Sequence, residues 1–343
     1  MTFRRARLPA LVVVLMLAAL AGYFQFSGSP PQSAPESSRY GLPALDPEMP
    51  LRSAEPIQPL PELPPLDPQK VALGRQLFHD RRLSADNSIS CASCHDLSRG
   101  GVDGRPVSQG VGGARGDVNA PSVLTASLNF RQFWDGRAAT LEEQAGGPIL
   151  NPKEMAAAWP EVIERLEADA GMKRAFMGVY PDGVTPDNVV AAIADFERSL
   201  PRPSRFDRWL RGDRDALSDE ERQGYQLFKK HGCIGCHQGA NVGGNLFQRF
   251  GIMSHYFNTK NSITQADRGR YNVTGQEEDR YIFKVPSLRN VALTAPYFHD
   301  GSVPRLEDAV AVMGRYQLGI NLPARDIGLI AAFLQSLTSE TLP

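Results

Sequence analysis

Four cysteines in the 343-residue chain form two Cys-x-x-Cys pairs, and each pair is followed at once by a histidine. The two motifs are Cys91, Cys94, His95 and Cys233, Cys236, His237. The thiols of such a motif add across the two vinyl groups of one haem, and the adjoining histidine binds the iron. A Cys-x-x-Cys pair is also half of a zinc site, but the chain has no further cysteine to complete a tetrahedron. The sequence therefore predicts two covalently bound c-type haems.

Covalent attachment leaves the second axial position of each iron free, so function sets its occupant. No histidine occurs between residues 96 and 230, so the loop after the first motif cannot supply one. Histidines outside a haem motif ordinarily form hydrogen bonds at the surface or to a propionate. The remaining histidines are His79, His231, His255 and His299. We expect the first haem to lack a second histidine, with movement of His79 or His255 toward the iron as the alternative.

Two methionines, Met253 and Met313, are candidate thioether ligands of the second haem. Buried methionine is most often core filler, so residue type alone does not choose between them. Met313 has helical spacing with Ala309 and Val310, which predicts a place on the apolar face of a helix. Tyr316 lies one helical turn further on and is a substitute ligand.

The elements that position these residues are predicted to be helices. Helix starts with an N-cap residue occur at Asp67-Pro68, Thr185-Pro186 and Ser218 with Glu221. Apolar residues recur at helical spacing in segments 189–196 and 327–334. Segments 98–120 and 238–280 are rich in glycine and polar residues, so we expect loops that lie over the haem faces. The sequence therefore predicts an all-α fold with little or no β-structure.

A short repeat precedes the two haem motifs. Residues 74–78 read GRQLF and residues 224–228 read GYQLF, so a helix leads into a haem-binding loop twice. The repeat and the chain length predict two c-type cytochrome domains, residues 67–203 and 204–343, each with one covalently bound haem.

The N-terminal segment has the pattern of an export signal. Three arginines precede an apolar run over residues 8–21, which ends in Ala19-Leu20-Ala21. Residues 1–26 are therefore predicted to be a signal peptide or an uncleaved N-terminal membrane anchor, because the apolar character continues to residue 26. Residues 27–66 are rich in proline and are predicted to be an extended tether or wrapping arm. We expect the body of the protein in the periplasm.

Further segments resemble motifs of the bacterial di-haem cytochrome c peroxidase and MauG family. They are residues 133–138 (FWDGRA), 151–155 (NPKEM), 288–290 (LRN) and 294–299 (TAPYFH). The resemblance covers nearly the whole chain from about Leu66 to the C-terminus. It implies a peroxidatic haem in the first domain and an electron-transfer haem in the second.

The resemblance implies roles for residues around the first haem. His95 looks like the proximal ligand of the peroxidatic haem, and Glu154 looks like its distal acid/base, with Gln144 and Pro148 beside it. A carboxylate over the iron can take a proton from the near oxygen of peroxide and return it to the departing oxygen. Without the resemblance, Glu154 would be read as a solvated carboxylate at a helix start.

The resemblance also implies roles between the haems and at the second haem. Trp134 looks like the inter-haem tryptophan of the family, which shortens the path for electron tunnelling, although a tryptophan alone is more often core. His237 and Met313 look like the ligands of a high-potential haem that accepts electrons from outside, because Met/His ligation raises the potential. The resemblance thus favours Met313 over the other candidate ligands.

Three more residues resemble positions that hold a calcium ion between the domains. They are Asn119, Thr294 and Pro296. Calcium prefers oxygen donors of this kind but takes six to eight of them, so waters must complete the shell.

One position departs from the family pattern. Many family peroxidases have a gating histidine in the loop after the first haem, where this chain has Val111 within Gln109-Gly110-Val111-Gly112. Without that ligand, the first haem should be open to peroxide even when fully oxidised. The departure puts the reductive activation typical of the family in question.

Three functions compete. The first is a peroxidase that reduces hydrogen peroxide with electrons from a small cytochrome c or cupredoxin, and Met313 favours it because MauG-like members tend to use tyrosine there. The second is a MauG-like oxidase that oxidises residues of a partner protein, and the open first haem favours it. The third is a plain di-haem electron carrier, in which Glu154 and Trp134 would have no role. The formal net charge of −1 implies no nucleic acid partner, and a homodimer is left open.

Overall fold

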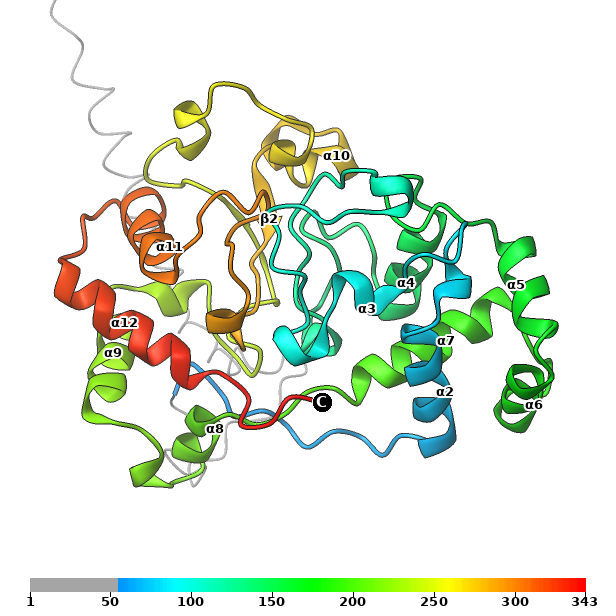
Figure 1. Ribbon diagram of the computed structural model, residues 1–343. Helices are drawn as coiled ribbons and strands as arrows, with labels where there is room; N and C mark the ends of the chain where they lie inside the picture. The colour runs from blue at the N-terminus through cyan, green and yellow to red at the C-terminus, as the bar shows by residue number, and fades with distance from the viewer. Residues whose placement is uncertain (1–54) are drawn as a thin grey trace, which may run out of the picture. The chain divides into compact units, whose positions relative to one another are not determined.

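The computed structural model describes residues 55–343, which are mostly helical (Figure 1). Its α-helices are α2 (Pro68–Phe78), α3 (Cys91–Cys94), α4 (Leu141–Leu150), α5 (Trp159–Glu167), α6 (Ala170–Val179), α7 (Pro186–Arg198), α8 (Arg205–Leu210), α9 (Asp219–Lys230), α10 (Tyr271–Thr274), α11 (Leu306–Val312) and α12 (Ala324–Ser336). Strands β1 (Phe247–Arg249) and β2 (Ile282–Lys284) pair antiparallel, with Phe247 opposite Lys284. The prediction of a mainly helical chain with little β-structure is confirmed.

Part of the predicted organisation lies outside the described residues. The signal peptide or anchor predicted for residues 1–26 belongs there, as does the proline-rich segment up to residue 54. Within residues 55–343, no helix combines the length and the apolar character needed to cross a membrane.

The three predicted helix starts are confirmed. Side-chain oxygens there accept hydrogen bonds from amides that have no partner in the first turn of a helix. At the start of α2, Asp67 accepts from the amide two residues on, at 2.8 Å. At the start of α7, Thr185 accepts from the amide three residues on, at 3.2 Å. At the start of α9, Ser218 and Glu221 form a reciprocal capping box.

The repeated segment before each haem motif packs in the same way in both halves of the chain. Helix α2 lies against α7, and α9 lies against α12 (Figure 1). A Cβ atom on Gly74 would lie 1.8 Å from the carbonyl oxygen of Ala192, and one on Gly224 would lie 1.9 Å from that of Leu329. Each crossing therefore requires glycine, because no side chain fits between the two backbones. The sequence repeat is a repeated helix pair that leads into a Cys-x-x-Cys-His motif.

Two hydrophobic clusters form the core of the described chain. The first draws on residues between 73 and 200 and contains the fully buried Phe196. The second draws on Ile57 and on residues between 206 and 337, and it contains the fully buried Phe333. Burial of such rings stabilises the helix pairs that carry the two motifs. Both clusters belong to one compact unit.

Residues 55–66 contain no helix or strand and pack against the second cluster. Ile57 is fully buried there. The Leu60 amide donates to Oδ1 of Asp207 at 2.6 Å, and Asp207 also accepts from two nitrogens of Arg289, at 2.8 and 2.9 Å. The buried ion pair therefore fixes the end of the proline-rich segment to the second half of the chain.

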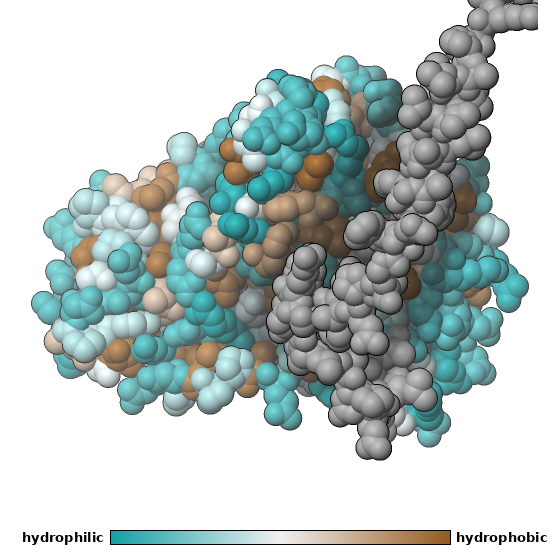
Figure 2. All heavy atoms as spheres, turned by 180° about the vertical axis from the view of Figure 1, so that it is seen from behind, coloured by the Kyte–Doolittle hydropathy of each residue, from teal (hydrophilic) through white to brown (hydrophobic). Residues whose placement is uncertain are grey.

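The face of the molecule in Figure 2 is largely hydrophilic, with smaller apolar patches between the polar side chains. Among the described residues, Met253 is the most exposed large apolar side chain, at 63%. Its exposure matters because Met253 is one of the two candidate thioether ligands.

Candidate haem sites

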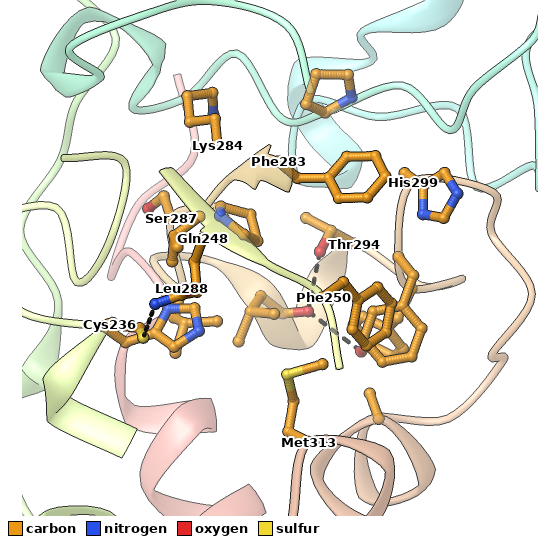
Figure 3. A pocket seen from close by; sticks show the side chains of 18 of the residues that line it. Cys236, Gln248, Phe250, Phe283, Lys284, Ser287, Leu288, Thr294, His299 and Met313 are labelled. Carbon is orange, nitrogen blue, oxygen red and sulfur yellow. Dashed lines mark hydrogen bonds between the residues drawn. The ribbon is translucent and has the colours of Figure 1, made fainter. Parts of the chain in front are cut away.

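The second motif lies on the wall of a cavity. A short 3₁₀ helix, Cys233–Gly235, follows α9, and Cys233, Cys236 and His237 all line the cavity together with Met313. In Figure 3 the sulfur atoms of Cys236 and Met313 both lie at the cavity wall. Two thiols, an imidazole and a thioether around one largely apolar space are the donor set of a c-type haem with His/Met ligation. The residues of the cavity therefore fit this cofactor.

The orientation of His237 suits an iron ligand. Its Nδ1 atom lies 3.3 Å from the carbonyl oxygen of Val242, and because a carbonyl oxygen only accepts, Nδ1 carries the hydrogen. The lone pair is then on Nε2, as in metal-bound histidines whose other nitrogen is held by a carbonyl. Burial lowers the pKa of His237 to about 4, so the ring is neutral at pH 7.

The first motif holds its histidine in the same way. Residues Cys91–Cys94 form the one-turn helix α3, capped through a hydrogen bond from the Ser90 amide to Oγ of Ser93 at 2.9 Å. His95 follows, with Nδ1 3.1 Å from the carbonyl oxygen of Gly101. Burial lowers the pKa of His95. Both motifs therefore present a neutral imidazole with Nε2 free for iron.

Glu154 lies close to the first motif. Burial raises the pKa of both Cys91 and Cys94, and the charge of Glu154 adds to the rise at each thiol. Burial also raises the pKa of Glu154 itself. A hydrogen bond from Nδ2 of Asn151 to Oε1 of Glu154, at 2.7 Å, lowers this pKa by a smaller amount. A carboxyl group with a raised pKa is a stronger base than an ordinary carboxylate, which suits a group that must accept a proton and return it.

The loop with Val111 is fixed to the segment that contains Glu154. The Val111 amide donates to the Glu154 carbonyl oxygen at 2.8 Å. A Cβ atom on Gly110 would lie 2.2 Å from the Lys153 carbonyl oxygen, so the two backbones touch. The position where the family pattern has a gating histidine is therefore adjacent to Glu154 and holds an apolar side chain.

The four histidines outside the motifs have other surroundings. His79 and His255 are exposed. Nε2 of His231 lies 3.2 Å from Asp326, and that of His299 lies 2.8 Å from Asp267. The expected surface role agrees with the placement of His79 and His255, whereas His299 is buried and bound to a carboxylate of the chain.

Met253, Met313 and Tyr316 are the candidate ligands for the second haem. Of these three residues, only Met313 lines the cavity. Helix α11 ends one residue before it, and Met313 begins a π-helical turn, Met313–Gln317, rather than lying within the α-helix as its spacing had indicated. Tyr316 packs edge-on against Tyr256, with ring centroids 5.2 Å apart. Met253 is exposed and contacts Gly319. Single π-helical turns are frequent at functional sites.

Trp134 extends from the first half of the chain into the cavity of the second motif. Its side chain lines that cavity, and its Nε1 donates to the carbonyl oxygen of Asn119 at 2.9 Å. The Trp134 ring lies edge-on to that of His299, with centroids 6.4 Å apart. An indole held in this way has a fixed orientation at the boundary of the two halves.

The three candidate calcium ligands all line this cavity as well. Thr294 and Pro296 are two residues apart, and Asn119 comes from a distant part of the sequence. The side-chain nitrogen of Asn119 donates to the Arg105 carbonyl oxygen at 2.7 Å, which leaves its side-chain oxygen free to accept. The fold thus brings the predicted residues together.

A second group of potential metal ligands, Asp267, His299 and Asp300, lies nearby. The Lys260 ammonium forms ion pairs with both carboxylates, at 2.7 Å to Asp300. These contacts lower the pKa of Asp267 in spite of burial. The group is therefore an ion-pair network that already contains its cation.

Gln144 lies on α4, half-buried and one turn before Pro148, so both face the same side of that helix.

Two buried charged residues near the haem motifs were not predicted from the sequence. Lys284 lines the cavity of the second motif. Burial raises the pKa of Cys91 most, and the charge of Glu197 on α7 raises it further. The sequence signal for Lys284 is a lysine within the otherwise apolar segment 282–285.

The chain is similar to several known proteins. A family profile described as di-haem cytochrome c peroxidase matches residues 68–215. The chain is 54% identical over 291 residues to cytochrome c peroxidase Ccp of Escherichia coli K12, covering 84% of this chain and 62% of that protein. It is 48% identical over 289 residues to cytochrome c551 peroxidase of Nitrosomonas europaea, covering 83% and 85%. It is 35% identical to methylamine utilization protein MauG of Methylorubrum extorquens, covering 83% and 84%.

A solved structure is similar as well. The crystal structure of a MauG-like protein associated with microbial copper homeostasis superimposes with a TM-score of 0.72 at 31% identity, covering 88% of this chain and 95% of that one. The chain belongs to the di-haem cytochrome c peroxidase family, which confirms the resemblance seen in the sequence. Membership of this family implies two c-type haems.

Proposed function

We propose that this protein is a di-haem c-type peroxidase that reduces hydrogen peroxide to water with electrons from a small cytochrome c or cupredoxin. The observation that carries the proposal is the difference between the two motifs. A carboxyl group with a raised pKa, Glu154, lies near the first, and a thioether, Met313, lines the cavity of the second. Relatives that are 42–54% identical over most of this chain are named cytochrome c peroxidases.

At the first site, a haem bound through Cys91 and Cys94 supplies the redox chemistry, with His95 as its proximal ligand. Glu154 manages protons: it takes one from the near oxygen of peroxide and returns it to the departing oxygen. Asn151 orients the Glu154 carboxyl group through its 2.7 Å hydrogen bond. Two electrons and two protons complete the reduction of one peroxide to two waters.

At the second site, His237 and Met313 would hold the haem iron, since both line the cavity that contains Cys233 and Cys236. Thioether ligation stabilises ferrous iron, so this haem is suited to accept electrons from a donor protein. Trp134, held by Asn119 at the boundary of the halves, provides an aromatic group on the route toward the first haem. Gln144 and Pro148 are assigned to the distal side of the first haem by the family pattern.

A MauG-like oxidase is the second candidate function, and Val111 beside Glu154 is the observation that favours it. An open first haem could react with peroxide while both haems are oxidised. A plain electron carrier is the least suitable candidate, because a half-buried Glu154 near two haem thiols would have no use.

The finer features of the protein belong to the same proposal. We assign residues 67–203 and 204–343 to the peroxidatic and electron-transfer domains, and Asn119, Thr294 and Pro296 to a calcium ion completed by waters. Export to the periplasm, with or without an N-terminal anchor, follows from the pattern of residues 1–26.

Steady-state oxidation of a reduced c-type cytochrome by the holoprotein in the presence of hydrogen peroxide tests the proposal. We expect turnover that saturates with both substrates. Rapid reaction of the fully oxidised protein with peroxide, without turnover of any donor but with oxidation of tyrosine or tryptophan in an added protein, would instead support the MauG-like function.

A further inference from the structure

A buried lysine on the wall of the second cavity has no carboxylate partner in the described chain. Lys284, the last residue of β2, is 5% exposed. Across residues 55–343 no ion pair forms with its ammonium group, and burial alone lowers the pKa of Lys284 to about 8. Burial of an ammonium group without a counter-ion has an unfavourable free energy. We therefore expect this site to bind an anion that the described residues do not provide.

The other charged residues around the cavity also favour the binding of an anion. Three basic residues line it, Arg249, Lys284 and Arg289, and its described lining contains no aspartate or glutamate. Arg289 is neutralised by its two hydrogen bonds to Asp207. Among the described residues, the Arg249 guanidinium donates to the backbone carbonyl oxygen of Glu278, at 3.1 Å, and forms no ion pair. The cavity that contains the second haem motif thus carries an excess of positive charge in a largely apolar space.

Backbone hydrogen bonds fix the position of Lys284. Its amide donates to the carbonyl oxygen of Trp134 at 2.8 Å, and it pairs with Phe247 across the sheet. In Figure 3, Lys284 lies across the cavity from Met313. A haem carries two propionate groups, which are the anions that this cofactor would bring into the cavity.

We propose that Lys284 binds a propionate of the haem attached at Cys233 and Cys236, and that its charge raises the reduction potential of this haem. Reduction removes one positive charge from the iron, so a nearby ammonium favours the ferrous state by compensating that loss. The inference depends on the proposed function only in assigning a haem to the second motif. Lys284 is a positioning and tuning residue, since it acts on the haem and not on peroxide.

Three variants of the holoprotein test the inference. Lys284→Met keeps the length of the side chain and removes its charge, and Lys284→Arg keeps the charge. Lys230→Met is the matched control, because Lys230 is exposed at the end of α9, three residues before Cys233. The reduction potential of the low-spin haem is measured by spectroelectrochemical titration from pH 6 to pH 9, and resonance Raman spectra report the propionate bending band.

In Lys284→Met we expect the equilibrium constant for reduction of this haem to fall about tenfold, which is 59 mV for one electron. We expect the propionate band to shift and the potential to become more dependent on pH, because the unpaired propionate takes up a proton. Lys284→Arg should stay within about threefold of the wild type. Lys230→Met should leave the potential and the Raman band unchanged.

Equal potentials in Lys284→Met and Lys230→Met, or an unshifted propionate band, would overturn the inference. Thermal unfolding of each holoprotein checks that the variants are folded. None of these measurements uses peroxide. A wild type without peroxidase turnover would therefore refute the proposed function and leave the assignment of Lys284 standing.

Discussion

The Val111 amide donates a 2.8 Å hydrogen bond to the carbonyl oxygen of Glu154, so the loop after the first haem motif is fastened to the segment that carries the candidate proton shuttle. A change in this loop would therefore be transmitted to Glu154 directly. The contact also places an apolar residue where the family pattern has a gating ligand. In the proposed mechanism, access of peroxide and transfer of its protons therefore depend on two segments that are joined by this hydrogen bond.

Glu154→Gln should keep both haems and their spectra but lower kcat/KM for peroxide by about 10²–10⁴-fold, because an amide cannot shuttle a proton. Steady-state kinetics with a reduced cytochrome measure the loss. Glu164→Gln is a matched control, since Glu164 is exposed on α5. Turnover of Glu154→Gln within a few fold of the control would remove Glu154 from the mechanism.

Met313→Ala should lower the potential of the second haem, with at least a tenfold fall in its equilibrium constant for reduction, and slow the entry of electrons. Binding of peroxide at the first haem should stay largely intact. Potentiometric titration and stopped-flow reduction by a donor measure the two effects. If the potential instead shifts in Tyr316→Phe and not in Met313→Ala, the ligand is Tyr316.

The fully oxidised protein should contain one high-spin and one low-spin haem in equal amounts. The reason is that residues 96–230 contain no histidine and Val111 stands where the family pattern has the gating ligand, whereas His237 and Met313 are the proposed ligands of the second iron. Electron paramagnetic resonance measures the ratio. Two low-spin haems, with no reaction toward peroxide until one electron is added, would reveal a gate formed by another residue.

Val111→His should restore a gate. The histidine would stand beside Glu154, and we expect conversion of part of the first haem to the low-spin form and a slower reaction with peroxide in the oxidised state. Val273→His, at a position that is 44% exposed, is the control. A spectrum of Val111→His identical to that of the control would show that this loop does not reach the iron.

Glu197→Gln should remove part of the pH dependence of stability. Burial raises the pKa of Glu197 to about 8 from an ordinary value of 4.5. The folded state therefore binds more protons than the unfolded chain between these values, and the free energy of unfolding falls as the pH rises, by up to about 1.4 kcal/mol per pH unit. Urea denaturation at pH 5, 6.5 and 8 measures the slope. An equal slope in wild type and variant would show that Glu197 is already ionised when folded.

The sequence predicted those features that depend on local signals. The Cys-x-x-Cys-His motifs, the N-caps at Asp67, Thr185 and Ser218, and the helical pattern need only neighbouring residues to be recognised. The choice of Met313 came from the family resemblance, because helical spacing alone could not exclude Met253. Its π-helical turn was not foreseen, since it depends on packing at the end of α11.

Features that depend on tertiary packing were not predictable from residue patterns. The buried state of Glu197 follows from the packing of α2 on α7. The isolation of Lys284 follows from the absence of acidic residues among the described lining of a cavity whose walls come from segments up to 215 residues apart, Asn119 to Leu334. The ion pair between Asp207 and Arg289 is likewise a contact between distant segments. Such residues look like ordinary surface charges until the fold encloses them.

The glycine crossings at Gly74 and Gly224 limit how the two halves of the chain can diverge. Because backbone touches backbone at each crossing, side-chain substitutions cannot adjust the spacing of the helix pairs, and the scaffold under both haems is held to one geometry. The differences between the halves therefore lie outside these crossings. Glu154 lies near the first motif and Met313 lines the cavity of the second, so the same kind of helix pair supports two chemically different surroundings.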